Sequence, residues 1–484
     1  MPSTNLTGRF KAAALSLLSM PLACTAAEPE RLNVLLIAID DLGADLGCYG
    51  DPAARTPNLD ALAQRGTAFA RAYCQFPLCN PSRASLLTGL RPDRAGVHDL
   101  PTHFREAQPS AVTLPQYFRQ HGYRTARVGK IFHAGVPVHI GLDGLDDPAS
   151  WDERHNPSGR DKDEEALCKN LTPGRGPGVA IRILAAEGGD EEQTDGMVAT
   201  ETIRLLEKAG AGAQPFFIAA GFYRPHVPYV APKRYFDLHP LAHVPVPPDP
   251  TQALASVPSA ALRMSPLFWG LSTEQQRETI QAYYACVSFV DAQVGRLVSA
   301  LGRLKLDRNT VIVLWSDHGY LLGEHGQWHK ESLFEPALRS PLMVISPRSA
   351  PTPPSVRLVE FVDIYPTTVE LAGLPVPAGL DGRSLVPLMK EPDAPWPHPA
   401  LSQVWNGKAY GRSIRDERYR YTEWGPVGAE GVQLYDLEVD PGEQRNLAGW
   451  SQYRAVEHGL AAKLHELLPW VPGVPKPRAQ AKPE

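Results

Sequence analysis

The chain is poor in cysteine, in net charge and in long apolar runs. It has six cysteines among 484 residues, with no CxxC pair and no HExxH motif. This low density excludes a disulfide-built scaffold, and the missing motifs argue against a zinc site. Lys and Arg number 48 against 53 Asp and Glu, which leaves no basic field for a nucleic-acid partner. Beyond the N-terminal segment, no run reaches the roughly 20 apolar residues of a membrane span, so we expect none.

The first 27 residues have the pattern of a signal peptide. Arg9 and Lys11 precede an apolar run over residues 12–23, and small residues follow from Cys24 onward. A basic start, an apolar core of about 7–15 residues and a small-residue exit predict export to the periplasm or the extracellular space. Cys24 also faintly resembles the lipidated cysteine of a bacterial lipoprotein, which is a second and less favoured interpretation of this segment.

Strands and helices alternate along the main part of the chain. Near-continuous apolar runs of strand length cover residues 32–39, 215–220 and 310–315, and residues 125–129 repeat the pattern more weakly. Helical spacing of apolar residues covers residues 194–208 and 275–304. Such apolar runs are typical of strands buried on both faces of a parallel sheet. We therefore expect an α/β fold with a large, mainly parallel sheet sandwiched by helices.

Breaks in this alternation indicate how the chain is organised. Residues 134–188 and 239–266 are irregular and rich in Gly or Pro, so we interpret them as a long insertion and a loop. The Pro-rich run 392–399 predicts a linker, after which short strand-like segments and a helix over 453–468 predict a smaller α+β domain. The expected organisation is a signal peptide (1–27), a main domain (28–395), a C-terminal subdomain (396–470) and a flexible tail (471–484).

Side chains capable of chemistry follow the predicted strands, where parallel strands present their carboxyl ends to ligands. These residues are Asp40, Asp41, Lys130, His133, His226, Asp317 and His318. A single Asp after a strand is usually a turn or a helix cap. The adjacent carboxylates of Asp40 and Asp41, however, repel unless a cation neutralises them. With Asp317 they form a hard oxygen donor set suited to Ca²⁺ or Mg²⁺.

A second motif reads CNPSRASLLTG over residues 79–89. Pro81 suits the first turn of a helix and Gly89 suits its exit. Cys79 is therefore expected at a helix N-terminus, which attracts anions. Arg83 adds a permanent planar cation that can hold an oxyanion. Composition alone favours another interpretation, in which Cys79 is a small buried hydrophobe.

The motif CxPSR followed by xxLLTG resembles the signature of the type I sulfatases. The Asp40-Asp41 pair, the GKxxH pattern over 129–133 and the block from SDHG (316–319) to Lys330 are similar to the same family. The resemblance covers roughly residues 31–468. It implies an alkaline-phosphatase-like fold and hydrolysis of sulfuric esters.

Finer details resemble the iduronate-2-sulfatase branch of that family. They are LGCYGD, RPHVP and LGEHGQW over residues 46–51, 224–228 and 322–328. This resemblance implies a sulfated carbohydrate substrate, specifically a 2-O-sulfated uronic acid. The chain departs from that branch over residues 134–188 and in its C-terminal domain, where specificity would be set.

The resemblance also implies roles for individual residues. A maturation enzyme would oxidise Cys79 to formylglycine, and a hydroxyl of the hydrated aldehyde would attack the sulfur of a sulfated glycan or a small sulfate ester. Ca²⁺, rather than Mg²⁺, would be held by Asp40, Asp41, the modified Cys79, Asp317 and His318. The implied nucleophile derives from Cys79. Arg83, Lys130 and Lys330 would counter the charge on the sulfate. His226 or Lys330 would act as the acid, and His133 as the base.

Two other functions remain as alternatives. Some phosphonate hydrolases resemble this family and use formylglycine, so a phosphonate or phosphate monoester hydrolase is one alternative. A glycan-binding protein without catalysis is the other, although every expected catalytic position is filled.

Overall fold

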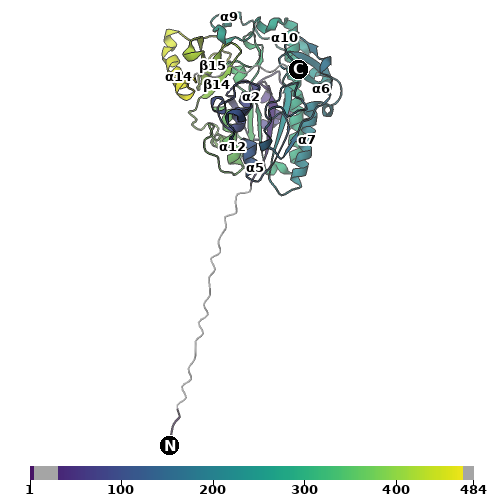
Figure 1. Ribbon diagram of the computed structural model, residues 1–484, viewed down its shortest axis with the longest axis vertical. Helices are drawn as coiled ribbons and strands as arrows, with labels where there is room; N and C mark the ends of the chain where they lie inside the picture. The colour runs from purple at the N-terminus through teal and green to yellow at the C-terminus, as the bar shows by residue number, and fades with distance from the viewer. Residues whose placement is uncertain (5–30, 472–484) are drawn as a thin grey trace. The chain divides into compact units, whose positions relative to one another are not determined.

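The computed structural model describes residues 1–4 and 31–471 (Figure 1). Residues 1–4 belong to an N-terminal unit, Met1–Glu30, and the second unit begins at Arg31. All described helices and strands lie in the second unit. Cys24 and nearly all of the predicted signal peptide and flexible tail lie outside the described residues.

An eight-stranded sheet forms the centre of the second unit, in the order β13-β2-β12-β9-β1-β7-β3-β4. Its four predicted strands are confirmed as β1 (Asn33–Asp40), β3 (Arg124–Gly129), β7 (Phe216–Pro225) and β9 (Thr310–Ser316). β1 lies between β7 and β9 and runs parallel to both. β12 (Leu342–Ile345) runs antiparallel to its neighbours β9 and β2 (Thr67–Tyr73). The sheet is therefore mainly parallel, as predicted.

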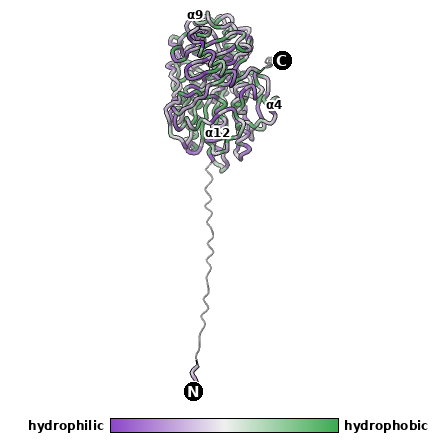
Figure 2. The backbone as a smooth tube through the Cα atoms, turned by 90° about the vertical axis from the view of Figure 1, so that its left-hand side faces the viewer, coloured by the Kyte–Doolittle hydropathy of each residue, from purple (hydrophilic) through white to green (hydrophobic). Residues whose placement is uncertain are grey.

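Helices cover both faces of this sheet. Leu35 and Ile37 of β1 pack in one apolar core with α7 (Thr194–Gly210) and α10 (Thr273–Arg303). Leu36 and Ala38 face the other core, which includes α2 (Cys79–Thr88), α5 (Leu114–Gln120) and α12 (Ile364–Leu371). Burying each large apolar side chain contributes about 1.5–3 kcal/mol. Hydrophobic and hydrophilic stretches alternate through the described backbone (Figure 2), as buried strands joined by polar connections require.

The segment 134–188 is more ordered than the expected irregular insertion. β4 (Glu153–His155) extends the main sheet by pairing with β3. β6 (Arg182–Ala186) pairs with β5 (Lys169–Asn170) and with β8 (Tyr229–Pro232). These strands are short and depend on distant partners, so their local sequence carries little strand signal.

The C-terminal part forms a four-stranded antiparallel sheet, β14-β15-β16-β17. Its strands are Ala400–Trp405, Tyr410–Arg415, Tyr419–Trp424 and Gly431–Asp436. α14 (Arg454–Leu467) packs on it through Leu460 and Leu464. This sheet and helix match the predicted α+β composition, and the domain boundaries at residues 27, 395 and 470 stay predictions. No helix within residues 1–4 and 31–471 is long and apolar enough to cross a membrane.

Candidate active site

Two neighbouring strands deliver acidic residues to the carboxyl edge of the main sheet. β1 ends at Asp40, and Asp317 and His318 follow β9. Asp41 turns the chain with a left-handed φ of 62°, a conformation that costs energy and clusters at functional sites. Its backbone N–H donates to Asp317 Oδ1 at 3.1 Å. All four side chains are buried, so the two strand ends form one enclosed acidic centre.

Cys79 is the first residue of α2, as the sequence predicted. Its Sγ lies 3.5 Å from His318 Nε2 and 3.8 Å from Asp41 Oδ1. Burial raises the pKa of the Cys79 thiol well above its usual range, against the opposing effect of two nearby lysines. Because the thiolate is the reactive form of cysteine, the unmodified side chain is a weak nucleophile despite its central position.

Arg83 lies one turn into α2 and contacts two carboxylates of the acidic centre. Its Nε donates to Asp317 Oδ2 at 2.9 Å, and Nη2 donates to Asp40 Oδ1 at 3.1 Å. Nη1 donates to two backbone carbonyls that follow β3, and the guanidinium lies 5.5 Å from the Trp315 ring centroid. Burial alone would lower the pKa of Arg83, but the two carboxylates outweigh this effect and raise the pKa above its usual value. Arg83 is therefore a fixed cation that holds the acidic side chains in place.

The two acidic groups that Arg83 joins differ in their electrostatics. Burial raises the pKa of Asp40, partly offset by Lys130. Burial acts in the same direction on Asp317, but Arg83 and His318 outweigh it and hold the pKa of Asp317 well below its usual range. Of these two carboxylates, Asp317 therefore stays the more firmly ionised.

Lys130 and Lys330 bring two ammonium groups to the same centre. Lys130 follows β3, and its Nζ lies 2.5 Å from Asp40 Oδ2. Lys330 follows β11 (Trp328–His329), and its Nζ contacts Asp41 Oδ1 and lies 3.2 Å from Cys79 Sγ. Burial would lower the pKa of Lys330, but Asp41 raises it above its usual value. A permanent cation therefore lies beside the thiol.

A close approach between β3 and β7 sets the position of Lys130. Gly129 has a φ of 73°, and a Cβ there would lie 2.2 Å from the Gly221 carbonyl oxygen. A Cβ on Gly221 would in turn lie 2.1 Å from the Lys130 carbonyl oxygen. No side chain fits at that separation. The glycine of the GKxxH pattern therefore has a structural cause.

Two buried histidines complete the group of predicted residues. His226 follows β7, and its Nδ1 donates to the Val227 carbonyl at 2.7 Å while Nε2 lies 3.7 Å from Asp41 Oδ2. Burial and the two site lysines lower the pKa of His226 well below its usual range. Burial and Lys130 do the same to the pKa of His133, whose Nδ1 is buried without a hydrogen-bond partner. Neutral imidazoles of this kind can take up protons.

The arrangement of ligand atoms fits a divalent cation. Two overlapping sets, each within 4.8 Å, are Asp41-Cys79-Asp317-His318 and Asp40-Asp41-Cys79-His226. Asp41 Oδ2 is buried without a hydrogen-bond partner, and a cation would satisfy such an acceptor. Carboxylate oxygens are the ligands that Ca²⁺ and Mg²⁺ prefer. His226, which the sequence assigned to proton transfer, is thus a further candidate ligand.

Two residues that hold the acidic turn were missed in the sequence. The Tyr283 hydroxyl of α10 donates to the Asp41 carbonyl at 3.0 Å and accepts from the Gly43 N–H at 2.8 Å. Ser316 Oγ, at the end of β9, accepts from the Leu42 N–H at 3.0 Å. Ser316 belongs to the SDHG motif and could have been assigned this role. Tyr283 lies 240 residues from Gly43, and its local sequence gives no sign of the contact.

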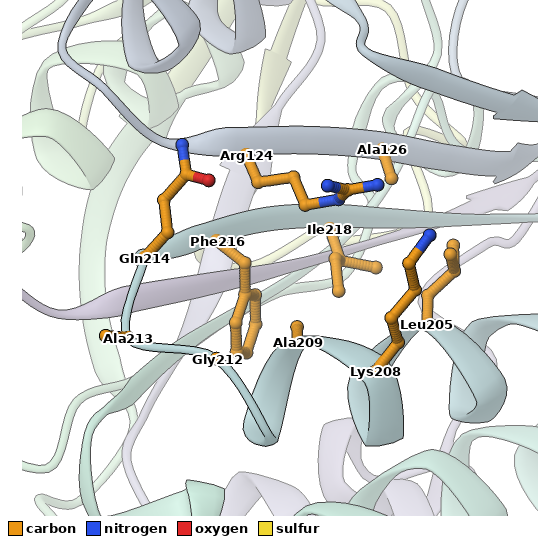
Figure 3. A pocket seen from close by; sticks show the side chains of 10 residues that line it. All are labelled: Arg124, Ala126, Leu205, Lys208, Ala209, Gly212, Ala213, Gln214, Phe216 and Ile218. Atoms are coloured by element: carbon orange, nitrogen blue, oxygen red, sulfur yellow. The ribbon is translucent and has the colours of Figure 1, made fainter.

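A separate hollow of about 210 Å³ lies at the opposite end of β3 and β7, next to the end of α7 (Figure 3). Its two cations, Arg124 and Lys208, both pair with Glu153. Its lining residues include no carboxylate, thiol or imidazole. This hollow therefore lacks the side-chain types that form the candidate active site.

Comparison with known proteins agrees with this geometry. The sulfatase family profile matches residues 32–374, and the profile "N-sulphoglucosamine sulphohydrolase, C-terminal" matches residues 323–469. The chain is 34% identical to iduronate 2-sulfatase of Mus musculus, over 89% of this chain and 93% of that protein.

Solved structures share the fold. A phosphonate monoester hydrolase of Agrobacterium radiobacter aligns with a TM-score of 0.74 and 26% identity, over 90% of this chain and 95% of that one. A 2-O GAG sulfatase aligns with a TM-score of 0.68 and 23% identity, over 90% and 92%. With the family profile spanning most of the chain and the acidic, basic and cysteine side chains meeting at one sheet edge, the chain belongs to the sulfatase family and is a sulfuric ester hydrolase.

Proposed function

We propose that this sulfatase removes sulfate from a 2-O-sulfated uronic acid of a glycan, using a formylglycine that a maturation enzyme makes from Cys79. The observation that carries the proposal is the position of Cys79 at the start of a buried helix, 3.2 Å from Lys330 Nζ and 3.5 Å from His318 Nε2. The 34% identity to an iduronate 2-sulfatase supports the choice of substrate.

The metal in this proposal is Ca²⁺. Asp40, Asp41, Asp317, His318 and the modified residue 79 would hold it. Ca²⁺ accepts six to eight oxygen ligands in flexible geometry, whereas Mg²⁺ usually keeps several waters, so a donor set of this size favours Ca²⁺. When bound, the cation supplies positive charge that acidifies the attacking hydroxyl and offsets the charge of the sulfate group.

The modified residue 79 explains why the precursor is a cysteine. Its hydrated aldehyde offers two hydroxyls, one that attacks the sulfur and a second whose deprotonation releases sulfate and restores the aldehyde. A serine in the same place would offer only one hydroxyl. It could be sulfated, but it could not expel the sulfate by this route.

The surrounding residues supply binding and proton transfer. Lys130 and Lys330 bind the sulfate oxygens and stabilise the charge that develops on them. His226 or Lys330 protonates the departing alcohol oxygen. His133, whose Nδ1 lacks a partner, takes the proton from the second hydroxyl.

The direct test is turnover of a 2-O-sulfated uronate disaccharide by protein co-produced with the maturation enzyme. The wild type should release sulfate, and Cys79→Ala should not. The likeness to a phosphonate monoester hydrolase makes phosphonate esters a second candidate substrate class. Rates on both ester types from one preparation separate the two, and faster phosphonate turnover would contradict the sulfate ester proposal.

We also propose that the chain is exported to the periplasm or the extracellular space, because its first 27 residues have the pattern of a signal peptide. Sequencing the N-terminus of the protein purified from its native host tests this. A mature chain that begins near residue 28 is expected, and a chain that retains Met1 in the cytoplasm would contradict export.

A further inference from the structure

Arg175, Trp269 and His329 form a stack that ends beside the active-site residue Lys330. Arg175 Cζ lies 3.8 Å from the Trp269 ring centroid. The Trp269 and His329 rings meet edge to face, with their centroids 4.9 Å apart. His329 directly precedes Lys330, whose Nζ lies 3.2 Å from Cys79 Sγ. An arginine of the 134–188 insertion is therefore connected through two aromatic rings to the sulfate site.

Arg263 brings a second guanidinium to the same place. Its backbone N–H donates to Gln327 Oε1 at 3.1 Å, and the next residue, Met264, accepts from the Trp328 N–H at 3.1 Å. Arg263 Nη1 pairs with Glu331 Oε2 at 2.5 Å. Because Glu331 directly follows the active-site lysine, Arg263 is fixed along the same segment as the stack.

The cations of this cluster outnumber its carboxylates. Across residues 31–471, Arg175 has a cation–π contact with Trp269 and no carboxylate at ion-pair distance. Arg175 is exposed, and partial desolvation together with the like charge of Arg263 lowers its pKa. Burial, Lys330 and both arginines also lower the pKa of His329. Within residues 31–471, the one ion pair of these two arginines joins Arg263 to Glu331, so excess positive charge borders the sulfate site.

The cluster also contains strained backbone and an unsatisfied polar atom. Trp269, His329 and Glu331 have left-handed φ values of 55°, 71° and 62°, which persist only where the surroundings impose them and which cluster at ligand sites. His329 is 3% exposed, and its Nε2 has no hydrogen-bond partner. A buried ring nitrogen of this kind calls for a partner, and an oxygen of a bound ligand would provide one.

We propose that Arg175, Arg263, Trp269 and His329 form a subsite for an anionic substituent of the sulfated sugar. This inference rests on the proposed function, under which the substituent is the carboxylate of the uronic acid. Trp269 holds the Arg175 guanidinium in place, so its planar fork can bind a carboxylate with two parallel hydrogen bonds. Arg263 adds charge, and His329 Nε2 pairs with an oxygen of the ligand.

The test compares Arg175→Ala with Lys169→Ala, a control in the same insertion whose ammonium pairs with Glu278 at the surface. Three substrates are used: a 2-O-sulfated uronate disaccharide, N,6-disulfated glucosamine, and 6-sulfated N-acetylglucosamine, which has no second anionic group. Arg175→Ala should lower kcat/KM on the uronate about 10- to 100-fold, mainly through KM, because a hydrogen bond to a charged group is lost. Turnover of the singly charged sugar should change less than about twofold, and Arg175→Lys should recover part of the loss.

If Arg175→Ala lowers kcat/KM only on the disulfated glucosamine, the subsite stands, but its ligand is a second sulfate group and not a carboxylate. Equal losses on all three sugars, or no loss on either doubly charged one, would overturn the subsite. Binding distinguishes this failure from failure of the proposed function. In Cys79→Ala protein, which cannot turn over, Arg175→Ala should weaken the Kd for the uronate disaccharide at least about tenfold. An unchanged Kd would overturn the subsite. If the Kd is weakened but the wild type turns over none of the three esters, only the proposed function is overturned.

Discussion

At the scale of single residues, Arg83 stabilises the fold at the candidate active site. Its guanidinium is fully buried and bonds to Asp40 and Asp317 at once. Arg83→Met would remove the guanidinium from Asp317 and leave Asp40 with Lys130 alone, and breaking a buried pair in this way typically costs about 3–5 kcal/mol of stability. Urea unfolding of the two proteins measures this difference.

The matched control is Arg119→Met, which removes an exposed ion pair with Asp152. Exposed pairs contribute at most about 1 kcal/mol, so this variant should unfold close to the wild type. Equal destabilisation by the two substitutions would contradict the role given to Arg83.

The meeting of the site residues could be predicted because the sequence indicated which strands precede them. Once residues 32–39 and 310–315 are recognised as parallel strands, Asp40 and Asp317 must lie at one edge of the sheet. The sequence could not reveal that Tyr283 holds the Asp41 turn, because that contact depends on how a distant helix packs. The sequence also suggested that Arg83 binds an oxyanion, whereas most of the N–H groups of its guanidinium donate to groups within the protein.

At the scale of elements, the close contact between β3 and β7 leaves no space for a side chain at Gly221. A Cβ there would lie 2.1 Å from the Lys130 carbonyl oxygen, so Gly221→Ala must push the strands apart. We expect a loss of about 1–3 kcal/mol in stability together with a lower kcat, because Lys130 moves with its strand.

Gly302→Ala provides the comparison, because a Cβ at that position in α10 meets no atom within 4 Å. Helix propensity should stabilise it by up to about 1 kcal/mol, with kcat unchanged. Unfolding curves and turnover rates of both variants test the pair. A Gly221→Ala enzyme as stable and active as the wild type would refute the close-contact argument.

The contact between α10 and His239 predicts a dependence of stability on pH. His239 Nε2 lies 2.9 Å from Ser288 Oγ, and burial lowers the pKa of His239 from 6.5 to about 4. Between these pH values the unfolded chain binds a proton that the folded chain does not, so stability falls as the pH drops from 6.5 to 4. Above pH 6.5 the contribution is fully present.

His239→Gln removes this titration and keeps a side chain that can hydrogen-bond. From pH 7.5 to pH 4.5 the variant should lose about 1–2 kcal/mol less stability than the wild type, after allowance for solvent screening. Urea midpoints at several pH values measure this. Parallel pH profiles for the two proteins would rule out His239 as the titrating group.

Elements were predictable where the apolar pattern was long and continuous. β1, β7 and β9 and the helices α7 and α10 have such patterns. β2, β12 and β4 were not foreseen. β2 includes Arg71, β12 has four residues and β4 has three, so their strand conformation comes from pairing with neighbours rather than from local sequence.

At the scale of the whole molecule, the C-terminal sheet is tied to the sheet that holds the site. Arg420 pairs with Glu335 and Glu443, and Glu335 accepts from the Tyr73 hydroxyl at 2.9 Å. The small α+β composition of this part could be predicted from its short strands and final helix. These long-range ion pairs could not, because they join residues that are far apart in sequence.

The proposed metal ligands come from three distant segments, and the proposed site predicts how the enzyme responds to chelation. Removing divalent ions should abolish sulfate release, because carboxylates, histidines and residue 79 together would hold the cation. Adding Ca²⁺ back should restore activity more fully than adding Mg²⁺. Undiminished activity in protein verified as metal-free would contradict the metal centre.

The most direct measurement is fragmentation mass spectrometry of the tryptic peptide 72–83, from protein made with its maturation enzyme and assayed for sulfate release. Because the peptide contains both Cys74 and Cys79, fragmentation must locate any change. We expect an aldehyde at position 79, an intact thiol at position 74 and an active sample. An active sample with an intact thiol at position 79 would contradict it.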